Sequence, residues 1–199
     1  MAKKTGTNRV DILRGTASAD TIKGLGGSDF LFGLGGNDTI LAGSGNDRAY
    51  GGAGKDTVRG ESGNDTLKGD DGNDKVYGGL GNDNARGGNG NDLVQGDSGN
   101  DKLFGDAGSD VLIGGSGTDR LYGGDGADYI VGGAGQDVLT GNDGGDRFVF
   151  ADGDSLRIQT GTGFLPGDSI TDFKGALQGG TDVIDFSLIP SVLILSATP

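Results

Sequence analysis

The sequence contains no cysteine and no histidine. These absences exclude a disulfide, a thiolate nucleophile, a Cys/His zinc site and any triad or general base that uses imidazole. Proline occurs only three times, and the 46 glycines do not recur at every third position, so the chain is not a collagen. Most hydrolase mechanisms are therefore excluded.

Hydrophobic residues are also scarce, at 32 % of the 199 residues, and no stretch approaches the roughly 18 apolar residues of a membrane span. The first ten residues lack the apolar segment of a cleaved secretory signal, so we expect none. This composition cannot build an ordinary globular core. From composition alone, a disordered acidic chain remains an alternative.

The acidic residues are unusual because Glu61 is the only glutamate among 29 Asp and Glu residues. Such a preference for aspartate suits turns and the ligation of hard cations. The net charge of −13 argues against nucleic acid or anionic lipid as a partner.

A nine-residue repeat runs from Gly15 to Val149 without insertion or deletion. With Gly15 as position 1, position 4 is glycine in every copy except the first, which has Ser18, and position 1 is glycine except at Ala42. Position 8 is apolar throughout. Such a constant phase rules out disorder for the metal-bound chain. Position 6 is aspartate in all fifteen copies, namely Asp20, Asp29, Asp38, Asp47, Asp56, Asp65, Asp74, Asp83, Asp92, Asp101, Asp110, Asp119, Asp128, Asp137 and Asp146.

Each copy is typical of a turn at positions 1–5 followed by a short strand at positions 7–9, with position 8 inside and its neighbours outside. Position 8 is mostly β-branched in odd copies, as in Val58, and is leucine or alanine in even copies, as in Ala49. This alternation predicts two walls and a coil of two repeats, in which copy i stacks on copy i+2 by parallel strand pairing. The sequence therefore predicts an all-β solenoid.

Even copies also place aromatic residues at position 9, as in Phe32 and Tyr50. We expect these rings to form a cross-strand ladder on an exposed face. A platform for a ligand is the alternative.

Stacking the copies sets equivalent aspartates about 4.8 Å apart, where their repulsion is about 1 kcal/mol per pair in water. A cation must therefore neutralise the stacked carboxylates. Calcium suits them because it takes roughly six to eight oxygens in flexible geometry, whereas magnesium needs a tighter octahedron and zinc prefers nitrogen or sulfur. An EF-hand is excluded, because the single glutamate, Glu61, cannot close a series of such loops.

The stretch Gly51-Gly52-Ala53-Gly54-Lys55-Asp56-Thr57-Val58-Arg59 matches the nonapeptide G-G-x-G-x-D-x-U-x. Residues 15–149 thus resemble the RTX, or hemolysin-type calcium-binding, repeat proteins. The resemblance implies a right-handed parallel β-roll with calcium between adjacent turns on each edge. It also implies that the position-6 carboxylates and the turn carbonyls at positions 2 and 4 are the ligands. The position-4 glycines are Gly27, Gly36, Gly45, Gly54, Gly63, Gly72, Gly81, Gly90, Gly99, Gly108, Gly117, Gly126, Gly135 and Gly144.

The first copy of the repeat departs from the motif at two positions. Thr16 and Ser18 depart from the motif, so we expect the first turn to bind calcium weakly or to act as a cap.

We expect a lead-in at 1–14, the β-roll at 15–149, and a C-terminal cap with a candidate type I secretion signal at 150–199. Segments 168–173 and 182–187 resemble the flank that follows the repeats in serralysin-like proteases, and an open solenoid end needs a cap.

The expected function is that of a secreted, extracellular, non-enzymatic calcium-binding protein. Its expected partners are several Ca²⁺ ions and a type I exporter, which in RTX proteins reads an uncleaved C-terminal signal. The alternatives are a calcium-binding module of a larger secreted enzyme, such as a protease, lipase or alginate epimerase, and a surface or adhesion protein. Catalysis by aspartate pairs is a further, weaker alternative.

Overall fold

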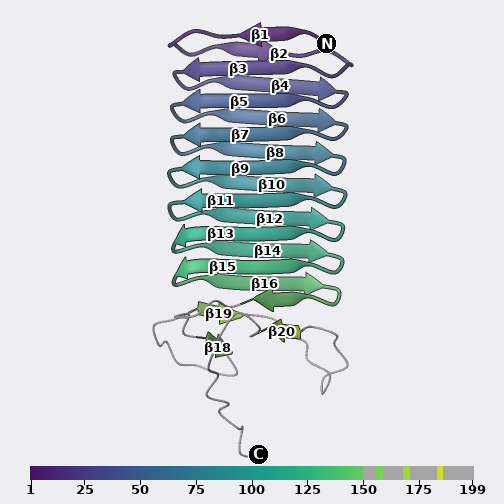
Figure 1. Cartoon of the computed structure of the whole chain (residues 1–199), viewed down its shortest axis with the longest axis vertical. Coiled ribbons are helices and arrows are strands. Elements are labelled where there is room, and N and C mark those ends of the chain that lie inside the picture. The colour runs from purple at the N-terminus through teal and green to yellow at the C-terminus, as the bar shows by residue number, and fades with distance from the viewer. Residues whose placement is uncertain (150–155, 159–167, 171–182, 186–199) are drawn as a thin grey trace, which may run out of the picture.

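The computed structural model describes residues 1–149, 156–158, 168–170 and 183–185. In these residues every regular element is a β-strand. The chain winds back and forth between two sheets of parallel strands, and successive coils stack into one elongated roll (Figure 1). No helix occurs in the described residues, so none there is long and apolar enough to span a membrane.

Odd-numbered strands from β1 to β17, with β20, form the first sheet, here called sheet A; even-numbered strands from β2 to β18, with β19, form the second, sheet B. Sheet A contains, in spatial order, β1 (Lys3–Thr5), β3 (Thr21–Gly26), β5 (Thr39–Ser44), β7 (Thr57–Ser62), β9 (Lys75–Leu80), β11 (Leu93–Ser98), β13 (Val111–Gly117), β15 (Tyr129–Gly135), β17 (Arg147–Val149) and β20 (Val183–Asp185). Sheet B contains β18 (Leu156–Ile158), β19 (Asp168–Ile170), β16 (Val138–Asp143), β14 (Arg120–Asp125), β12 (Lys102–Ala107), β10 (Asn84–Asn89), β8 (Thr66–Asp71), β6 (Arg48–Ala53), β4 (Phe30–Gly35) and β2 (Ile12–Arg14).

The register confirms the predicted eighteen-residue coil. Val58 pairs with Val76 in sheet A, and Ala49 pairs with Leu67 in sheet B, so each copy stacks on the copy two further along. The β-branched position-8 series lines sheet A and the Leu/Ala series lines sheet B, and every one of these side chains from Ile22 to Phe148 is fully buried. The core is a single narrow seam between the sheets.

The strands are longer than the sequence pattern predicts. Strand β7 continues through positions 1–3 of the next copy, where Glu61 pairs with Gly79 and Ser62 with Leu80. Assigning positions 1–3 to a turn is therefore wrong, because each coil supplies parallel partners that keep even this glycine-rich backbone paired within the sheet. The period-two alternation then places positions 6, 8 and 1 all inside, so the aspartates are interior residues.

The repeat geometry also extends before Gly15. Gly6 and Asp11 stand at positions 1 and 6 of a further unit, and the Asp11 amide donates to Asp29 Oδ1 over 2.8 Å. Strands β1 and β2 pair with β3 and β4, which places Lys4 in the interior column beside Ile22. A charged residue at the open end of a core column disfavours end-to-end pairing with another sheet.

At the other end, strand β19 pairs with β16 and strand β20 pairs with β17, while β18 pairs with β19. Both sheets therefore continue past the last repeat. The remainder of the predicted cap and the candidate secretion signal lie outside the described residues.

The structure confirms the aromatic ladder on the outer face of sheet B. The rings of Phe32 and Tyr50 stack with centroids 5.2 Å apart, and those of Phe104 and Tyr122 stack at 5.0 Å. The Arg86 guanidinium covers the Phe104 ring at 4.1 Å. The ring faces are thus occupied by neighbouring side chains of the same ladder.

Candidate metal centres

The position-6 aspartates form two columns, one along each edge of the roll, where the chain turns from one sheet to the other. Figure 1 shows the turns along both edges. The first column runs from Asp20 to Asp146 in eighteen-residue steps, and the second from Asp29 to Asp137. All fifteen side chains are at most 3 % exposed. Sequence reasoning therefore places these residues correctly in columns, and the structure adds that they are buried.

Each column is linked by hydrogen bonds between consecutive coils. The amide of Asp47 donates to Oδ1 of Asp65 over 2.8 Å, and the amide of Asp65 donates to Oδ1 of Asp83 over 2.7 Å. The same bond joins every stacked pair from Asp20 to Asp146. One oxygen of each carboxylate is thereby fixed in place by the backbone of the preceding coil.

The other carboxylate oxygen is not satisfied by the protein. Oδ2 is buried and accepts no hydrogen bond in each position-6 aspartate from Asp29 through Asp128. A buried, unpaired carboxylate oxygen is strongly unfavourable unless a cation or a proton neutralises it. A whole column of such atoms therefore points to bound cations.

The position-1 glycines leave room for these oxygens. A Cβ on Gly60 would overlap Oδ2 of Asp65 and would lie 2.5 Å from the carbonyl oxygen of Gly78. The unsatisfied oxygen thus lies beside backbone carbonyl oxygen, in a space that a larger side chain would fill. This environment consists of hard oxygen donors, which suit Ca²⁺.

The position-4 glycines carry the predicted carbonyl ligands. All fourteen have positive φ, between 94° and 143°. In the turns, a Cβ on Gly63 would overlap the carbonyl oxygen of Gly45, one coil earlier, so this carbonyl points along the stack toward its neighbour. Only glycine permits both this conformation and this close approach. The turn carbonyls therefore stack from coil to coil in eighteen-residue steps, as the aspartates do.

From the second copy onward, position 2 shares the left-handed conformation even where it is not glycine. Glu61 and Asp97 have φ of 73° and 72°. Glu61 pairs with Gly43 and Gly79 in the neighbouring coils, and Asp97 pairs with Gly79 and Gly115. A left-handed non-glycine residue costs about 1–2 kcal/mol, which asparagine and aspartate tolerate best. The parallel pairing with the neighbouring coils therefore overrides side-chain preference at this position.

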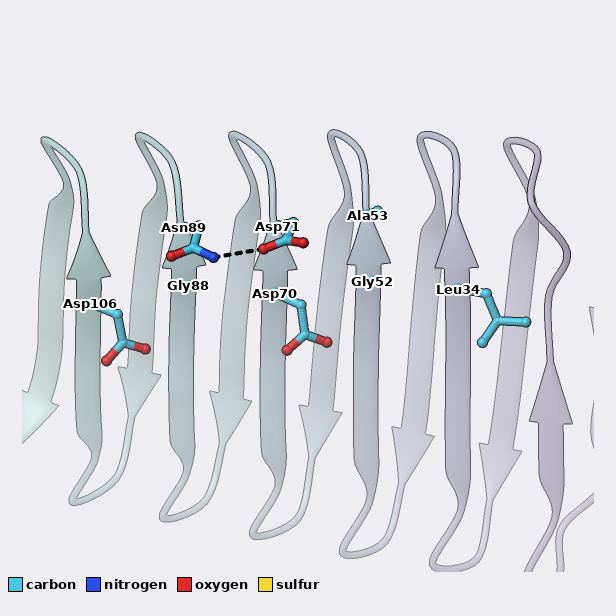
Figure 2. A pocket seen from close by; sticks show the side chains of 8 residues that line it. All are labelled: Leu34, Gly52, Ala53, Asp70, Asp71, Gly88, Asn89 and Asp106. Atoms are coloured by element: carbon cyan, nitrogen blue, oxygen red, sulfur yellow. Dashed lines mark hydrogen bonds between the residues drawn. The ribbon is translucent and has the colours of Figure 1, made fainter.

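Several position-2 and position-3 side chains border a shallow groove at one end of the sheet B strands. Figure 2 shows Asp70 and Asp106 on alternate strands, β8 and β12, with Gly88 between them. The side-chain Nδ2 of Asn89 donates to Asp71 Oδ1 over 2.7 Å. These carboxylates are on the surface, in contrast to the buried columns.

Burial changes the acidity of the columns. Desolvation raises the pKa of Asp65 and Asp110 to about 7, although the hydrogen bond from the preceding coil opposes the shift and neighbouring carboxylates add to it. The same causes raise the pKa of Asp83 and Asp101 to about 6. The carboxylates are thus held in a state that favours neutralisation by a proton or a cation.

The first turn is different. Oδ2 of Asp20 accepts hydrogen bonds from the Thr16 amide over 2.7 Å and from Thr16 Oγ1 over 2.8 Å, and Thr7 makes the same pair of bonds to Asp11. The pKa of Asp20 is lowered, chiefly by the hydrogen bond from the Ala2 amide and then by the Thr16 hydroxyl. Threonine at position 2 satisfies the carboxylate that elsewhere remains unpaired.

The donor set fits calcium rather than zinc. No group of three or more His, Cys, Asp or Glu side chains converges among the described residues, so an ion here would draw on carboxylates together with backbone carbonyls. Calcium accepts this mixture in flexible geometry, whereas zinc prefers nitrogen or sulfur.

Two features of the site are not evident from the repeat pattern. The unit with Asp11 lacks the turn glycines, because Thr7-Asn8-Arg9 stands in their place, and only the conserved spacing of nine could have revealed it. The hydrogen bonds from Thr7 and Thr16 have a clearer signal, since these two units alone have threonine at position 2.

Comparison with known proteins agrees with the site. No curated protein sequence matches the chain. The family model described as RTX calcium-binding nonapeptide repeat matches residues 5–40, 33–67, 50–85, 86–121, 113–148 and 122–156, which together make up more than half of the chain. RTX nonapeptide repeats bind multiple Ca²⁺ ions. The chain therefore belongs to the family of RTX calcium-binding nonapeptide repeat proteins.

Proposed function

We propose that this chain is a secreted calcium-binding protein whose roll folds when it meets extracellular calcium. The observation that carries the proposal is that, in both columns, the buried Oδ2 atoms of the position-6 aspartates from Asp29 through Asp128 accept no hydrogen bond. The position-6 aspartates and the carbonyls of the position-4 glycines, Gly27 to Gly144, are the proposed ligands.

Bound calcium would neutralise the charge of the carboxylates, and the protein fixes the orientation of those carboxylates. The amide of each coil holds Oδ1 of the next aspartate, as in the bond from Asp56 to Asp74, which fixes Oδ2 in orientation. Without a cation, bringing these carboxylates together in a buried column opposes folding. Metal binding and folding are therefore expected to be one coupled equilibrium.

Coupling of this kind suits export. RTX repeat proteins are typically secreted by type I systems. At low intracellular calcium the chain would remain unfolded and able to pass through an exporter, and calcium at about 10⁻⁴–10⁻³ M outside the cell would fold it. The roll serves as a structural, non-catalytic element in this proposal.

Far-UV circular dichroism during a calcium titration tests the proposal. We expect a disordered spectrum in chelator near neutral pH, a β-rich spectrum in millimolar calcium, and little change with magnesium at the same concentration. A β-rich spectrum that is unchanged by chelator would contradict coupled folding.

A further inference from the structure

The fourth copy of the repeat differs from all the others at position 1. Ala42 stands there in place of glycine, and its side chain is fully buried. Among the described residues, Ala42 is the one member of the hydrophobic core cluster that does not come from position 8. Its methyl group is therefore an addition to the interior that no other copy has.

Elsewhere in the array, the space that a side chain at position 1 would need lies between two oxygens. A Cβ on Gly51 would lie 2.5 Å from Oδ2 of Asp56 and 2.6 Å from the carbonyl oxygen of Gly69, one coil further along. Both distances are shorter than van der Waals contact. Carboxylate and carbonyl oxygens are the ligands that calcium takes in proteins. Glycine at position 1 thus keeps open the space between two candidate ligands.

At Asp47 this space contains the methyl group of Ala42. The residues that correspond to Asp56 and Gly69 are here Asp47 and Gly60, so the methyl group faces the Asp47 carboxylate and the Gly60 carbonyl. Oδ2 of Asp47 is buried and accepts no hydrogen bond, whereas Oδ1 accepts the Asp29 amide over 2.7 Å. The methyl group therefore affects the ligand oxygen and leaves the structural oxygen in its usual place.

We propose that Ala42 makes the calcium site at Asp47 weaker than the sites at Asp65 and Asp83 in the same column. The methyl group keeps an ion from contacting the Asp47 carboxylate and the Gly60 carbonyl together. The inference rests on the proposed calcium-dependent folding. Loss of a group that supports a metal site typically lowers the affinity by about tenfold or more. The site at Asp47 therefore fills at about tenfold higher calcium than its neighbours.

The effect is confined to one site. The carbonyl oxygen of Ala42 lies beside Oδ2 of Asp29, because a Cβ on Gly24 would overlap both oxygens. The alanine keeps this carbonyl, so the site at Asp29 retains its donors. The rest of the fourth copy is regular, since Gly43 and Gly45 have positive φ of 116° and 128°. A single methyl group thus distinguishes the site at Asp47 from the others.

The test follows amide hydrogen exchange by mass spectrometry in the full chain, as calcium is raised above the folding midpoint. In wild type, residues 42–50 should need about tenfold more calcium for full protection than residues 60–68, one coil further along the same edge. In Ala42→Gly, the two segments should reach full protection at the same calcium concentration. Ala53→Gly is the matched control, because it removes an exposed methyl group and should leave the wild-type difference intact.

A second variant separates the methyl group from its place near one end of the roll. Ala42→Gly/Gly96→Ala keeps the composition and moves the methyl group three coils along the same edge. There a Cβ would overlap Oδ2 of Asp101 and lie 2.6 Å from the Gly114 carbonyl oxygen. The segment that is protected last should then be residues 96–104.

Two results would overturn the inference. One is a wild type in which residues 42–50 and 60–68 reach full protection together, and the other is a delay at 42–50 that persists in Ala42→Gly. Failure of the proposed function gives a different result, because no segment would then gain protection as calcium is added. Circular dichroism in calcium shows that each variant is folded.

Discussion

The backbone amide of Asp47 donates a hydrogen bond to Oδ1 of Asp65, one coil further along the roll, while Oδ2 of Asp65 is buried and accepts no hydrogen bond. The relationship divides each carboxylate into a structural oxygen and an oxygen available to a cation. It explains why aspartate, rather than asparagine or serine, stands at position 6 in every copy.

Replacing one oxygen of this pair tests the division directly. Asp65→Asn keeps an acceptor for the Asp47 amide but replaces the ligand oxygen with an amide group. We expect fewer bound calcium ions, a higher calcium concentration at the folding midpoint, and a loss of about 2 kcal/mol in the free energy of unfolding in calcium. Isothermal titration and chemical denaturation measure these quantities.

Asp125→Asn is the matched control, since it removes the same charge from an exposed side chain at position 3. Its stoichiometry and stability should remain close to wild type. Equal effects of the two substitutions would mean that net charge, and not a ligand at position 6, determines calcium binding.

The space beside the Asp65 carboxylate is too small for an added methyl group at Gly60. Gly60→Ala places a Cβ against Oδ2 of Asp65 and near the Gly78 carbonyl, so it should weaken calcium binding and destabilise the folded roll. Gly35→Ala is the control, because its Cβ would meet nothing closer than 3.7 Å. Calcium titrations of the two variants should separate clearly. If Gly35→Ala is as damaging as Gly60→Ala, general loss of glycine flexibility is the cause.

Acid should partly replace calcium. Burial raises the pKa of Asp65 and Asp110 to about 7 in the folded chain, above the value of roughly 4 in an unfolded chain. The folded state then binds more protons, so the stability of the metal-free roll is greatest below about pH 4 and falls as pH rises toward 7. In chelator, circular dichroism should show more β-structure at pH 5 than at pH 7.5. The opposite trend would contradict this linkage.

The same linkage predicts competition between protons and calcium. Because a ligand carboxylate must lose its proton before it binds the metal, calcium affinity should fall as pH is lowered from 7.5 to 5.5. Calcium titrations at the two values measure the change, and an affinity independent of pH would show that the raised pKa values have no bearing on binding.

The first turn should behave as a metal-free turn. Thr16→Val removes the hydroxyl that bonds to Asp20, and we expect a loss of about 1 kcal/mol with no change in the number of bound ions. Thr39→Val, at an exposed strand position, is the matched control and should be nearly neutral. A reduced ion count in Thr16→Val would instead place a calcium ion at this turn.

Much of this architecture follows from the sequence because the repeat is regular. The alternation between Val58-like and Ala49-like interior residues is sufficient to predict the two walls, the eighteen-residue coil and the stacking of one aspartate on the next. The ladder of Phe32 and Tyr50 follows from the same register. These features depend on periodicity, which a single sequence displays fully.

Other features depend on three-dimensional contacts that periodicity does not express. Leu25 and Leu34 adopt positive φ near 80° although leucine disfavours it, because they stand at position 2, where every copy after the first has this conformation. The unit that contains Asp11 escapes detection because its turn lacks glycine. The burial of the aspartates is not expected from the sequence because the inside–outside alternation is applied there only to positions 7–9, whereas in the structure it extends back to position 6.

The most direct test of the central claim is a count of calcium ions bound per chain, by equilibrium dialysis, alongside circular dichroism at each calcium concentration. Coupled binding and folding predict that several ions bind over the same narrow concentration range in which the β-roll appears, with fewer ions in Asp65→Asn. Binding of several ions without any change in the spectrum, or a fully formed roll with no bound calcium at neutral pH, would contradict the account.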